Sequence, residues 1–427
     1  MKTKALRLYG KNDLRLDEYE LPALREGEIL ARVVSDSICM SSYKAAIQGG
    51  DHKRVPDNCA ENPIIIGHEL CGEIVEVGAK WTDKFKPGQK FAIQPAFNFM
   101  GVADGKQYTG IEACGYSFSN CGGDATYIIL PEFAIETGCI LPYSGDSFYA
   151  GSLAEAYSCV AGGFHGMYHT RRGSYAHIMN NKTGGTMAIL AGVGPMGLAA
   201  IDYIIHCNHS PRLLVVTDID DTRLARAARI LSVEEAARNG VELIYKNTRD
   251  GDPVAELRAI TGGKGFDDVM LFAPVSAVAA QADAILGTDG CLNCFAGPAD
   301  TKFSGMINLY NVHYANTHIM ATAGGNNDDL EEVLDMMSEG RLNPAYLVTH
   351  IGGLNAARDA TLNLPKIPGG KKLIYTGIDL PLTALADFER LGETEPMFAK
   401  LHELTEKTHG LWNPEAEKYL LSCLETK

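Results

Sequence analysis

Hydrophobic and polar residues alternate in the first third of the chain, over short runs that glycine and proline interrupt. Alternation with a period of two is typical of half-buried strands, and glycine and proline are typical of the turns between them. The pattern therefore predicts a β-rich domain with few helices over residues 1–157. The runs that carry it are ILARVVSDSI (29–38), CGEIVEVG (71–78), GQKFAIQPAF (88–97) and DATYIILP (124–131).

After residue 158 the pattern changes to uninterrupted apolar runs separated by segments of helical length. Six such runs predict the strands of a doubly wound parallel sheet, a Rossmann domain over residues 158–327, so the fold class is α/β. Residues 328–427 add a helix, two strands expected to rejoin the first domain, and a charged helical extension. The six runs are TMAILAG (186–192), RLLVVTDID (212–220), VELIYKN (241–247), DDVMLFA (267–273), GCLNCFAG (290–297) and THIMATAGG (317–325).

Composition excludes several kinds of partner and compartment. A net charge of −15 argues against nucleic acid, whose phosphate backbone requires a basic surface. The chain has no apolar run of membrane-spanning length and no signal-peptide core, so we expect a cytoplasmic protein without membrane contact.

Eleven irregularly spaced cysteines predict reduced thiols. The C-x-x-C pair of Cys291 and Cys294 lies in a predicted core strand, which favours packing over a redox or metal role.

A glycine-rich turn joins the first strand of the predicted Rossmann domain to the following helix. Gly192, Gly194 and Gly197 have the spacing G-x-G-x-x-G, and Pro195 and Met196 lie between the last two. Such glycines allow a tight turn, let the backbone approach a pyrophosphate, and let the helix pack closely on the strand. The turn therefore predicts a dinucleotide site, although the spacing alone would also fit an ordinary glycine turn.

An acidic residue in the next predicted strand supports the dinucleotide site. Asp218 ends the apolar run LLVVTD. A carboxylate at this position accepts hydrogen bonds from the ribose hydroxyls and repels a 2′-phosphate, which favours NAD(H) over NADP(H). The nearby Arg223 keeps that preference moderate.

Residues with zinc-ligand chemistry are spread through the first predicted domain. Cys39 ends a predicted strand, His68 and Glu69 lie in PIIIGHELCG, and Glu155 lies in LAEAYSC. A histidine beside a carboxylate among apolar residues requires a partner, and a catalytic zinc accepts mixed ligands. Each residue also has an ordinary interpretation: a small buried thiol, a hydrogen-bonded core histidine, or a carboxylate at a helix N-terminus. Only the combination predicts a metal site.

These segments occur in the order found in the zinc-dependent medium-chain alcohol and polyol dehydrogenases, which the chain resembles from residue 1 to about residue 378. The resemblance rests on Cys39 with Ser41 and on the segments GHELCGEIVEVG, GGDATYIILP, LAEAYSC and GVGPMG. It implies a GroES-like catalytic domain enclosing a Rossmann domain, with the active site between them. It also implies assembly into a homodimer or homotetramer.

The resemblance assigns roles to five residues. It implies that Cys39 and His68 bind one catalytic zinc. Glu155 takes the place of the carboxylate that completes the site, directly or through water, in polyol dehydrogenases. Glu69 matches a carboxylate that enters the metal shell in some members, and Ser41 matches the hydroxyl that relays the substrate proton.

The chain departs from the family pattern in two places. Many members carry four closely spaced cysteines in a structural zinc lobe, where this chain has only Cys114 and Cys121, so no structural zinc is expected. The segment GGDHKRVPDNCAEN (49–62) also makes the interval between the cysteine and histidine motifs longer than usual. An insertion here would reshape the substrate pocket.

The segment LVTHIGGLNAARDATLNLPKIPGGKKLIYT (347–376) resembles the L-sorbose-1-phosphate reductases, which implies reduction of L-sorbose 1-phosphate to D-glucitol 6-phosphate. A sugar phosphate requires cationic contacts. The candidates are Lys53 and Arg54 with His52, and the pair Lys371 and Lys372. Alternatives are a sorbitol-dehydrogenase-like enzyme acting on an unphosphorylated polyol or secondary alcohol, a zinc-free double-bond reductase, and an NAD-binding structural or regulatory protein without catalysis.

Overall fold

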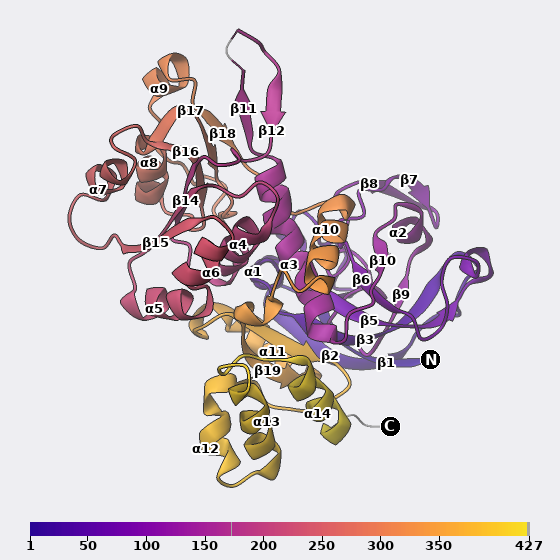
Figure 1. Cartoon of the computed structure of the whole chain (residues 1–427). Coiled ribbons are helices and arrows are strands. Elements are labelled where there is room, and N and C mark those ends of the chain that lie inside the picture. Colours follow the sequence, from indigo (N-terminus) through magenta and orange to yellow (C-terminus); the bar gives the residue numbers. More distant parts are fainter. Residues whose placement is uncertain (172, 425–427) are drawn as a thin grey trace. The chain divides into compact units, whose positions relative to one another are not determined.

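The computed structural model describes residues 1–171 and 173–424, and the chain divides into two compact units. The first unit is discontinuous and comprises Met1–Glu155 and Leu330–Lys427, whereas the second comprises Ala156–Asp329. Both boundaries fall inside helices, α3 (Phe148–His165) and α10 (Asn327–Ser338) (Figure 1). Residues 425–427 of the predicted C-terminal segment lie outside the described residues.

An eight-stranded mixed sheet forms the centre of the first unit. Its strands follow the order β10-β6-β5-β3-β20-β19-β21, and β9 also pairs with β3. The antiparallel pairing of β3 with β20 brings the C-terminal strands into the sheet begun by the N-terminal ones. The strands of this unit are β1 (Lys2–Gly10), β2 (Asp13–Glu20), β3 (Ile29–Ser37), β4 (Ile64–Ile65), β5 (Leu70–Val77), β6 (Lys90–Ile93), β7 (Met100–Ala103), β8 (Lys106–Thr109), β9 (Tyr127–Leu130), β10 (Ile140–Pro142), β19 (Val348–Gly353), β20 (Lys371–Tyr375) and β21 (Thr383–Ala384).

The C-terminal extension forms three helices with a core of their own. Phe388, Leu401 and Trp412 are fully buried, and the Trp412 indole N–H donates to the Tyr375 hydroxyl of β20 at 2.8 Å. The extension is therefore attached to the central sheet rather than a loose tail. The helices of the first unit are α1 (Met40–Gln48), α2 (Glu132–Glu136), α11 (Leu354–Leu362), α12 (Phe388–Gly392), α13 (Pro396–Glu406) and α14 (Pro414–Leu424).

Six parallel strands form the sheet of the second unit, in the order β15-β14-β13-β16-β17-β18. All six predicted strands are present, which confirms the Rossmann-like sheet. The order reverses at β13, and in such sheets the crevice at the carboxyl ends beside that strand receives the ligand. The elements are β13 (Thr186–Leu190), α4 (Pro195–His206), β14 (Leu213–Asp218), α5 (Asp221–Ile230), α6 (Val233–Arg238), β15 (Glu242–Asn247), α7 (Pro253–Ile260), β16 (Phe266–Leu271), α8 (Ser276–Ala284), β17 (Leu286–Asn293), α9 (Leu309–Tyr314) and β18 (His318–Met320).

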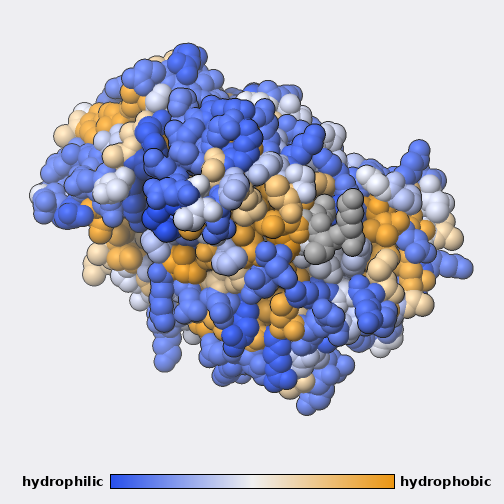
Figure 2. All heavy atoms as spheres, turned by 90° about the horizontal axis from the view of Figure 1, so that it is seen from below, coloured by the Kyte–Doolittle hydropathy of each residue, from blue (hydrophilic) through white to orange (hydrophobic). Residues whose placement is uncertain are grey.

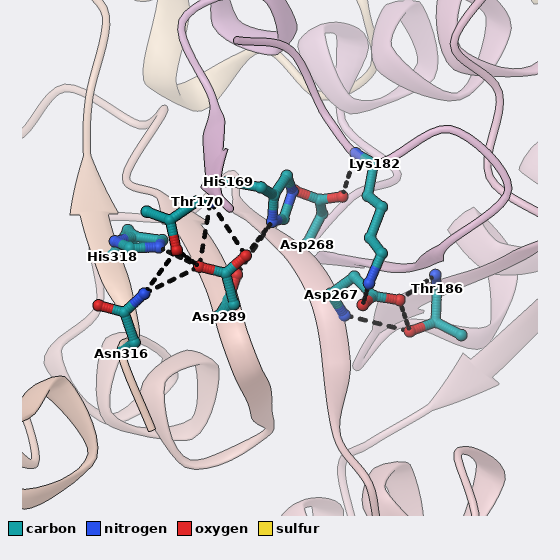
Figure 3. A network of polar contacts seen from close by, with 9 residues as sticks. All are labelled: His169, Thr170, Lys182, Thr186, Asp267, Asp268, Asp289, Asn316 and His318. Carbon is teal, nitrogen blue, oxygen red and sulfur yellow. Dashed lines mark hydrogen bonds and ion pairs between the residues drawn. The ribbon is translucent and has the colours of Figure 1, made fainter. Parts of the chain in front are cut away.

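A hairpin of β11 (Tyr168–Thr170) and β12 (His177–Met179) is fixed to the second unit by the polar network in Figure 3. The Asp289 carboxylate accepts from the Thr170 backbone N–H at 3.0 Å and from His318 Nε2 at 2.9 Å. His169 faces the Asp268 carboxylate at 3.0 Å and the Asp289 carbonyl at 2.9 Å. Burial lowers the pKa of His169, but the contacts with Asp268 and Asp289 raise it by a larger amount. The pKa therefore lies above its ordinary value. Both ring nitrogens can therefore donate.

The face drawn in Figure 2 is mostly hydrophilic, and apolar patches lie between charged and polar side chains. Acidic residues outnumber basic ones by 53 to 38. An acidic protein must hold an anionic substrate with a local group of basic side chains. Across residues 1–171 and 173–424, no helix combines the length and the apolar composition needed to cross a bilayer.

Candidate functional site

Three of the predicted zinc ligands lie together in the first unit. Cys39 is the N-cap residue of α1, just after β3, and His68 and Glu69 directly precede β5. Because β3 and β5 are hydrogen-bonded neighbours, the two motifs meet at one end of the sheet. The candidate ligand atoms of the three residues all lie within 4.8 Å of one another. A thiol, an imidazole and a carboxylate at this spacing fit a zinc ion.

The protonation states of the site also fit a cation. Burial lowers the pKa of His68, although Glu155 and Glu69 oppose the shift, so the ring is neutral and has a lone pair to offer. The Nδ1–H group of His68 can donate a hydrogen bond to Ser42 Oγ, which lies 3.3 Å away. This tautomer leaves the lone pair of Nε2 for a metal. Burial raises the pKa of the Cys39 thiol, and a bound cation would favour the thiolate.

Glu155 lies beside this group, on α3. It is 8% exposed and stands about two turns into the helix, so it is not a first-turn carboxylate of the kind that the helix dipole favours. Burial raises the pKa of Glu155 to about 7, although the neighbouring His68 opposes that rise. A carboxyl group with this pKa can exchange a proton near neutral pH.

A buried ion pair joins Glu69 to Lys371 of β20, 302 positions away in the sequence. The two side chains are 1% and 5% exposed. Burial favours the neutral form of each, but their mutual attraction prevails: the pKa of Glu69 is lowered and that of Lys371 is raised. The other carboxylate oxygen, Oε2, is buried and makes no close hydrogen bond with the described residues, although the nearby Ser37 hydroxyl helps to lower the pKa of Glu69. That oxygen is therefore suited to a metal ion.

The second lysine of the predicted phosphate-binding pair is also buried. The Lys372 ammonium donates to the backbone carbonyls of Ile367, Pro368 and Gly370, at 3.2, 3.1 and 2.7 Å. With Lys371 held by Glu69, both ammonium groups are already engaged inside the protein. These positions do not support the phosphate contacts that the sequence predicted for this pair.

Tyr116 belongs to the site, and sequence reasoning missed it. Its hydroxyl lies 3.4 Å from His68 Nε2 and shares a hydrogen bond with Ser41. His52 stacks on the Tyr116 ring with 5.6 Å between ring centroids, and the Arg54 guanidinium carbon lies 5.8 Å from the ring centroid. The inserted segment thus places a cation beside the candidate zinc ligands. No spacing motif marks Tyr116.

The neighbour of Arg54, Lys53, is exposed. Its place next to Arg54 in the chain adds a second positive charge to the inserted segment. Lys53 is therefore available to an anionic ligand.

Two buried aspartates lie behind the histidine motif. Asp36 and Asp124 are 0% and 1% exposed, and burial together with the charge of Asp124 raises the pKa of Asp36 well above its ordinary value. Two buried carboxyl groups that interact in this way keep at least one proton between them near neutral pH. A side chain at Gly67, whose φ is +92°, would lie 2.5 Å from an Asp36 oxygen, so glycine is required there. The pair therefore supports the backbone that leads into His68.

We expect Asp124→Asn to change how stability depends on pH. Burial raises the pKa of Asp124 to about 7, against an ordinary value of 3.8, although Asp36 and His68 oppose the rise. Between about pH 4 and pH 7 the unfolded chain releases a proton that the folded chain keeps, so this group lowers the free energy of unfolding as pH rises. Asparagine removes that slope and can donate to Asp36. Relative to wild type, the variant should gain on the order of 4 kcal/mol across this interval.

Urea unfolding at a series of pH values measures this difference. The exposed Asp83→Asn is the matched control, and its stability difference from wild type should stay constant. A constant difference for Asp124→Asn as well would contradict a shared proton.

The predicted dinucleotide turn lies between β13 and α4 in the second unit. Gly194 is the N-cap residue of α4, and Pro195 and Met196 are the first two helical residues. A side chain at Gly197 would collide with the backbone of Gly192, so only glycine allows this close contact. The turn thus presents the helix N-terminus, with its free N–H groups, to an anion.

Both charged residues predicted for the cofactor lie near this turn. Asp218 ends β14, the neighbour of β13, and its Oδ1 accepts from the backbone N–H groups of Ile219 and Asp220 at 2.9 and 3.2 Å. The Arg223 guanidinium lies 3.3 Å from the position that a Cβ of Gly194 would occupy. The structure therefore places a carboxylate and a cation where the sequence predicted a dinucleotide.

The lobe between β6 and β9 is packed around aromatic rings. Phe99 and Tyr108 each lie 4.9 Å from Phe133, measured between ring centroids. Cys114 and Cys121 are buried in the same core with their sulfur atoms 3.4 Å apart. Apolar packing thus holds together a lobe for which the sequence predicted no structural zinc.

The N-terminal and the central part of the chain each match a known protein family. Residues 25–137 match the alcohol dehydrogenase GroES-like domain, and residues 195–339 match the zinc-binding dehydrogenase domain. The chain is 49% identical to mannitol-1-phosphate 5-dehydrogenase of Aliivibrio fischeri, over 98% of this chain and 97% of the relative. It is 46% identical to L-sorbose 1-phosphate reductase of Klebsiella pneumoniae, over 99% of this chain and 98% of the relative.

A solved structure shows the same fold. The 2R,3R-butanediol dehydrogenase of Bacillus subtilis superposes with a TM-score of 0.67 at 22% sequence identity. The match covers 99% of that chain but 88% of this one, so part of this chain has no counterpart there. The predicted combination of a GroES-like and a Rossmann-like domain is confirmed.

Proposed function

We propose, from the premise that the chain belongs to the zinc-dependent alcohol and polyol dehydrogenases, that it transfers hydride between NAD(H) and a sugar phosphate. The substrate we propose is L-sorbose 1-phosphate: with NADH and a proton it gives D-glucitol 6-phosphate and NAD⁺. The observation that carries the proposal is Arg54, which lies over Tyr116 beside His68. Both close relatives are named for a hexose-derived phosphate, which supports the same substrate class.

Four side chains form the proposed zinc site. Cys39 and His68 would hold one zinc ion, and Glu69 and Glu155 would be its carboxylates. Zinc bound there supplies Lewis-acid chemistry that polarises the oxygen of the reacting carbon. Lys371 keeps Glu69 ionised through their buried ion pair. Glu155, with a pKa of about 7, can give or take a proton beside the reacting carbon.

Ser41 is the proposed proton carrier. Its hydroxyl lies 3.6 Å from Cys39 Sγ and shares a hydrogen bond with the Tyr116 hydroxyl. A hydroxyl group can accept one proton while it donates another, so Ser41 can pass the substrate proton on without carrying a charge. Tyr116 holds the Ser41 hydroxyl in place for this transfer.

The second unit would hold NAD(H), which accepts or donates the hydride at its nicotinamide. The turn from Gly192 to Gly197 and the N-terminus of α4 would receive the pyrophosphate, and Arg223 would add a positive charge there. Asp218 would accept hydrogen bonds from the ribose hydroxyls.

We expect Asp218→Ser to shift the cofactor preference towards NADP(H). Serine removes the charge that would repel a 2′-phosphate, while Arg223 remains to attract it. The ratio of kcat/KM for NADH to that for NADPH should fall by on the order of 10- to 100-fold. Asp220→Ser is the control, because Asp220 caps α5 through the Arg223 N–H and has no proposed ribose contact. An unchanged ratio in Asp218→Ser would contradict the proposed NAD preference.

The substrate proposal is tested by measuring NADH oxidation with L-sorbose 1-phosphate and with L-sorbose, using zinc-loaded protein. We expect a strong preference for the phosphate ester. Arg54→Ala and Lys53→Ala should raise KM for the ester by about 10-fold or more and leave kcat/KM for L-sorbose unchanged. An unchanged KM would remove the phosphate contact. Activity confined to the neutral sugar would instead favour an enzyme of the sorbitol dehydrogenase type.

Mannitol 1-phosphate is a second candidate, favoured by the 49% identical relative. That relative is named for reaction at carbon 5 of a 1-phosphate, whereas the ketone of L-sorbose 1-phosphate is next to the phosphorylated carbon. The two substrates thus place the phosphate at different distances from the reacting carbon. Parallel assays of NAD⁺ reduction with mannitol 1-phosphate and D-glucitol 6-phosphate distinguish them.

We also propose, from the family alone, that the protein acts in the cytoplasm as a homodimer or homotetramer. Light scattering of the purified protein measures the oligomeric state. A monomer at micromolar concentration would contradict the proposed assembly.

A further inference from the structure

A buried carboxylate of the C-terminal extension caps the helix that carries Glu155. Glu417 of α14 is 3% exposed, and its two oxygens accept from the backbone N–H groups of Phe148 at 2.6 Å and Tyr149 at 2.8 Å. These are the first two residues of α3, whose N–H groups have no partner within the helix. Glu417 therefore supplies, from 268 positions away in the sequence, hydrogen bonds that this helix end needs.

A second set of contacts fixes the Glu417 carboxylate itself. The Tyr375 hydroxyl donates to Glu417 Oε1 at 2.8 Å, and the Trp412 indole N–H donates to that hydroxyl at 2.8 Å. The Tyr375 and Trp412 side chains are fully buried. Tyr375 ends β20, the strand that begins with Lys371. One chain of hydrogen bonds thus joins the extension, the central sheet and the start of α3.

The first turns of α3 are also in close contact with the strands that carry the zinc motifs. A side chain at Gly151 would lie 2.5 Å from Cys71 Sγ of β5, so the helix packs closely against the strand there. Ser152 Oγ lies 3.1 Å from Ser35 Oγ of β3. Because an α-helix is stiff over two turns, a shift at its first residues is transmitted to Glu155.

We propose that Glu417 is a positioning residue for the zinc site: through the N-terminus of α3 it sets the place of Glu155 relative to Cys39 and His68. This inference rests on the proposed function, in which Glu155 belongs to the zinc site. It gives the C-terminal extension a role that no motif in its sequence indicates.

Glu417→Leu tests the inference, because leucine has a similar size and accepts no hydrogen bond. Glu417→Gln is the conservative variant and keeps an acceptor oxygen. Phe398→Ala is the matched control: it destabilises the extension by removing buried packing in α13, and it leaves the α3 contacts in place. All variants are produced as the full chain, and their melting temperatures are measured first.

Two measurements follow the metal rather than the activity. The first is the rate at which zinc-loaded protein loses zinc to a chelator, and the second is the visible absorption spectrum of the cobalt(II)-substituted protein. Glu417→Leu should lose zinc about 10-fold faster or more, with altered cobalt bands, as expected when a group that orients a metal ligand is removed. Glu417→Gln should stay within about threefold of wild type. Phe398→Ala should leave both quantities unchanged.

Glu155→Gln separates failure of the inference from failure of the proposed function. If Glu155→Gln alters zinc loss and the cobalt spectrum while Glu417→Leu behaves like Phe398→Ala, the inference is wrong and the proposed site stands. If Glu155→Gln alters neither quantity, the proposed role of Glu155 is wrong, and the inference falls with it.

A milder variant keeps the test decisive if Glu417→Leu does not fold. Trp412→Phe removes only the N–H that holds the Tyr375 hydroxyl and keeps most of the buried ring. It should speed zinc loss about threefold and speed hydrogen exchange of the Phe148 and Tyr149 amides. Zinc loss and amide exchange equal to those of Phe398→Ala would overturn the inference.

Discussion

Replacing His68 with alanine is expected to remove most of the bound zinc and to lower kcat/KM for L-sorbose 1-phosphate by on the order of 10³-fold or more. His68 is a buried, neutral imidazole whose Nδ1 faces Ser42 and whose ring packs on Tyr116 with 4.9 Å between ring centroids. Alanine offers no ligand atom, and the space left by the missing imidazole would hold only water. A 10³-fold loss corresponds to about 4 kcal/mol of transition-state stabilisation, within the several kcal/mol that a metal Lewis acid supplies.

Zinc content by atomic absorption and steady-state kinetics check this prediction on the same samples. His402→Ala provides the control, because it removes a partly buried histidine of α13 that has no proposed role in the zinc site. The control should keep its zinc and most of its activity. If His68→Ala kept both zinc and activity, the roles proposed for Cys39 and His68 would be lost together.

The elements that could be predicted are those whose signal is local. The strands of the parallel sheet are covered on both faces, so they appear as short apolar runs, and Val215 and Val269 are fully buried. The glycine turn could be predicted because Gly197 must lie against Gly192 within one turn of chain. Cys39, His68 and Glu69 belong to short motifs at the ends of neighbouring strands. Their meeting follows from one strand pairing.

The contacts that could not be predicted join residues far apart in the sequence. Lys371 is a candidate for phosphate on sequence grounds because the pair with Lys372 is one of the few basic clusters of an acidic chain, and nothing near it in the sequence identifies Glu69 as its partner. Tyr116 lies in a lobe with only two cysteines, Cys114 and Cys121, so no ligand spacing marks it. Glu417 belongs to a helix rich in charged residues, where a carboxylate usually faces water. Pairing of this kind depends on the folded topology rather than on local pattern.

Lys371→Met is expected to lower the free energy of unfolding of the zinc-free protein by about 3–5 kcal/mol. Methionine has a similar length but no charge, so the substitution leaves Glu69 ionised and buried without its counter-charge. Removing one partner of a buried pair is costly for this reason, even where the intact pair adds little net stability. Urea unfolding at pH 7 measures the loss. Lys400→Met, which breaks the exposed pair with Glu403, should cost no more than about 1 kcal/mol.

The double variant Lys371→Met with Glu69→Leu shows whether the loss arises from the stranded carboxylate. Because it removes both charges, it should recover most of the stability lost in Lys371→Met. A double variant as unstable as Lys371→Met would mean that packing at Lys371, and not its charge, matters.

The single variant Lys371→Met also shows whether Glu69 has a metal ion as a second partner, in addition to Lys371. A zinc ion bound at Cys39 and His68 would place a positive charge near the buried Glu69 Oε2. Zinc should therefore compensate part of the lost lysine charge, and the destabilisation by Lys371→Met should shrink by at least about 1 kcal/mol at saturating zinc. Equal losses with and without zinc would place Glu69 outside the metal shell and make it a partner of Lys371 alone.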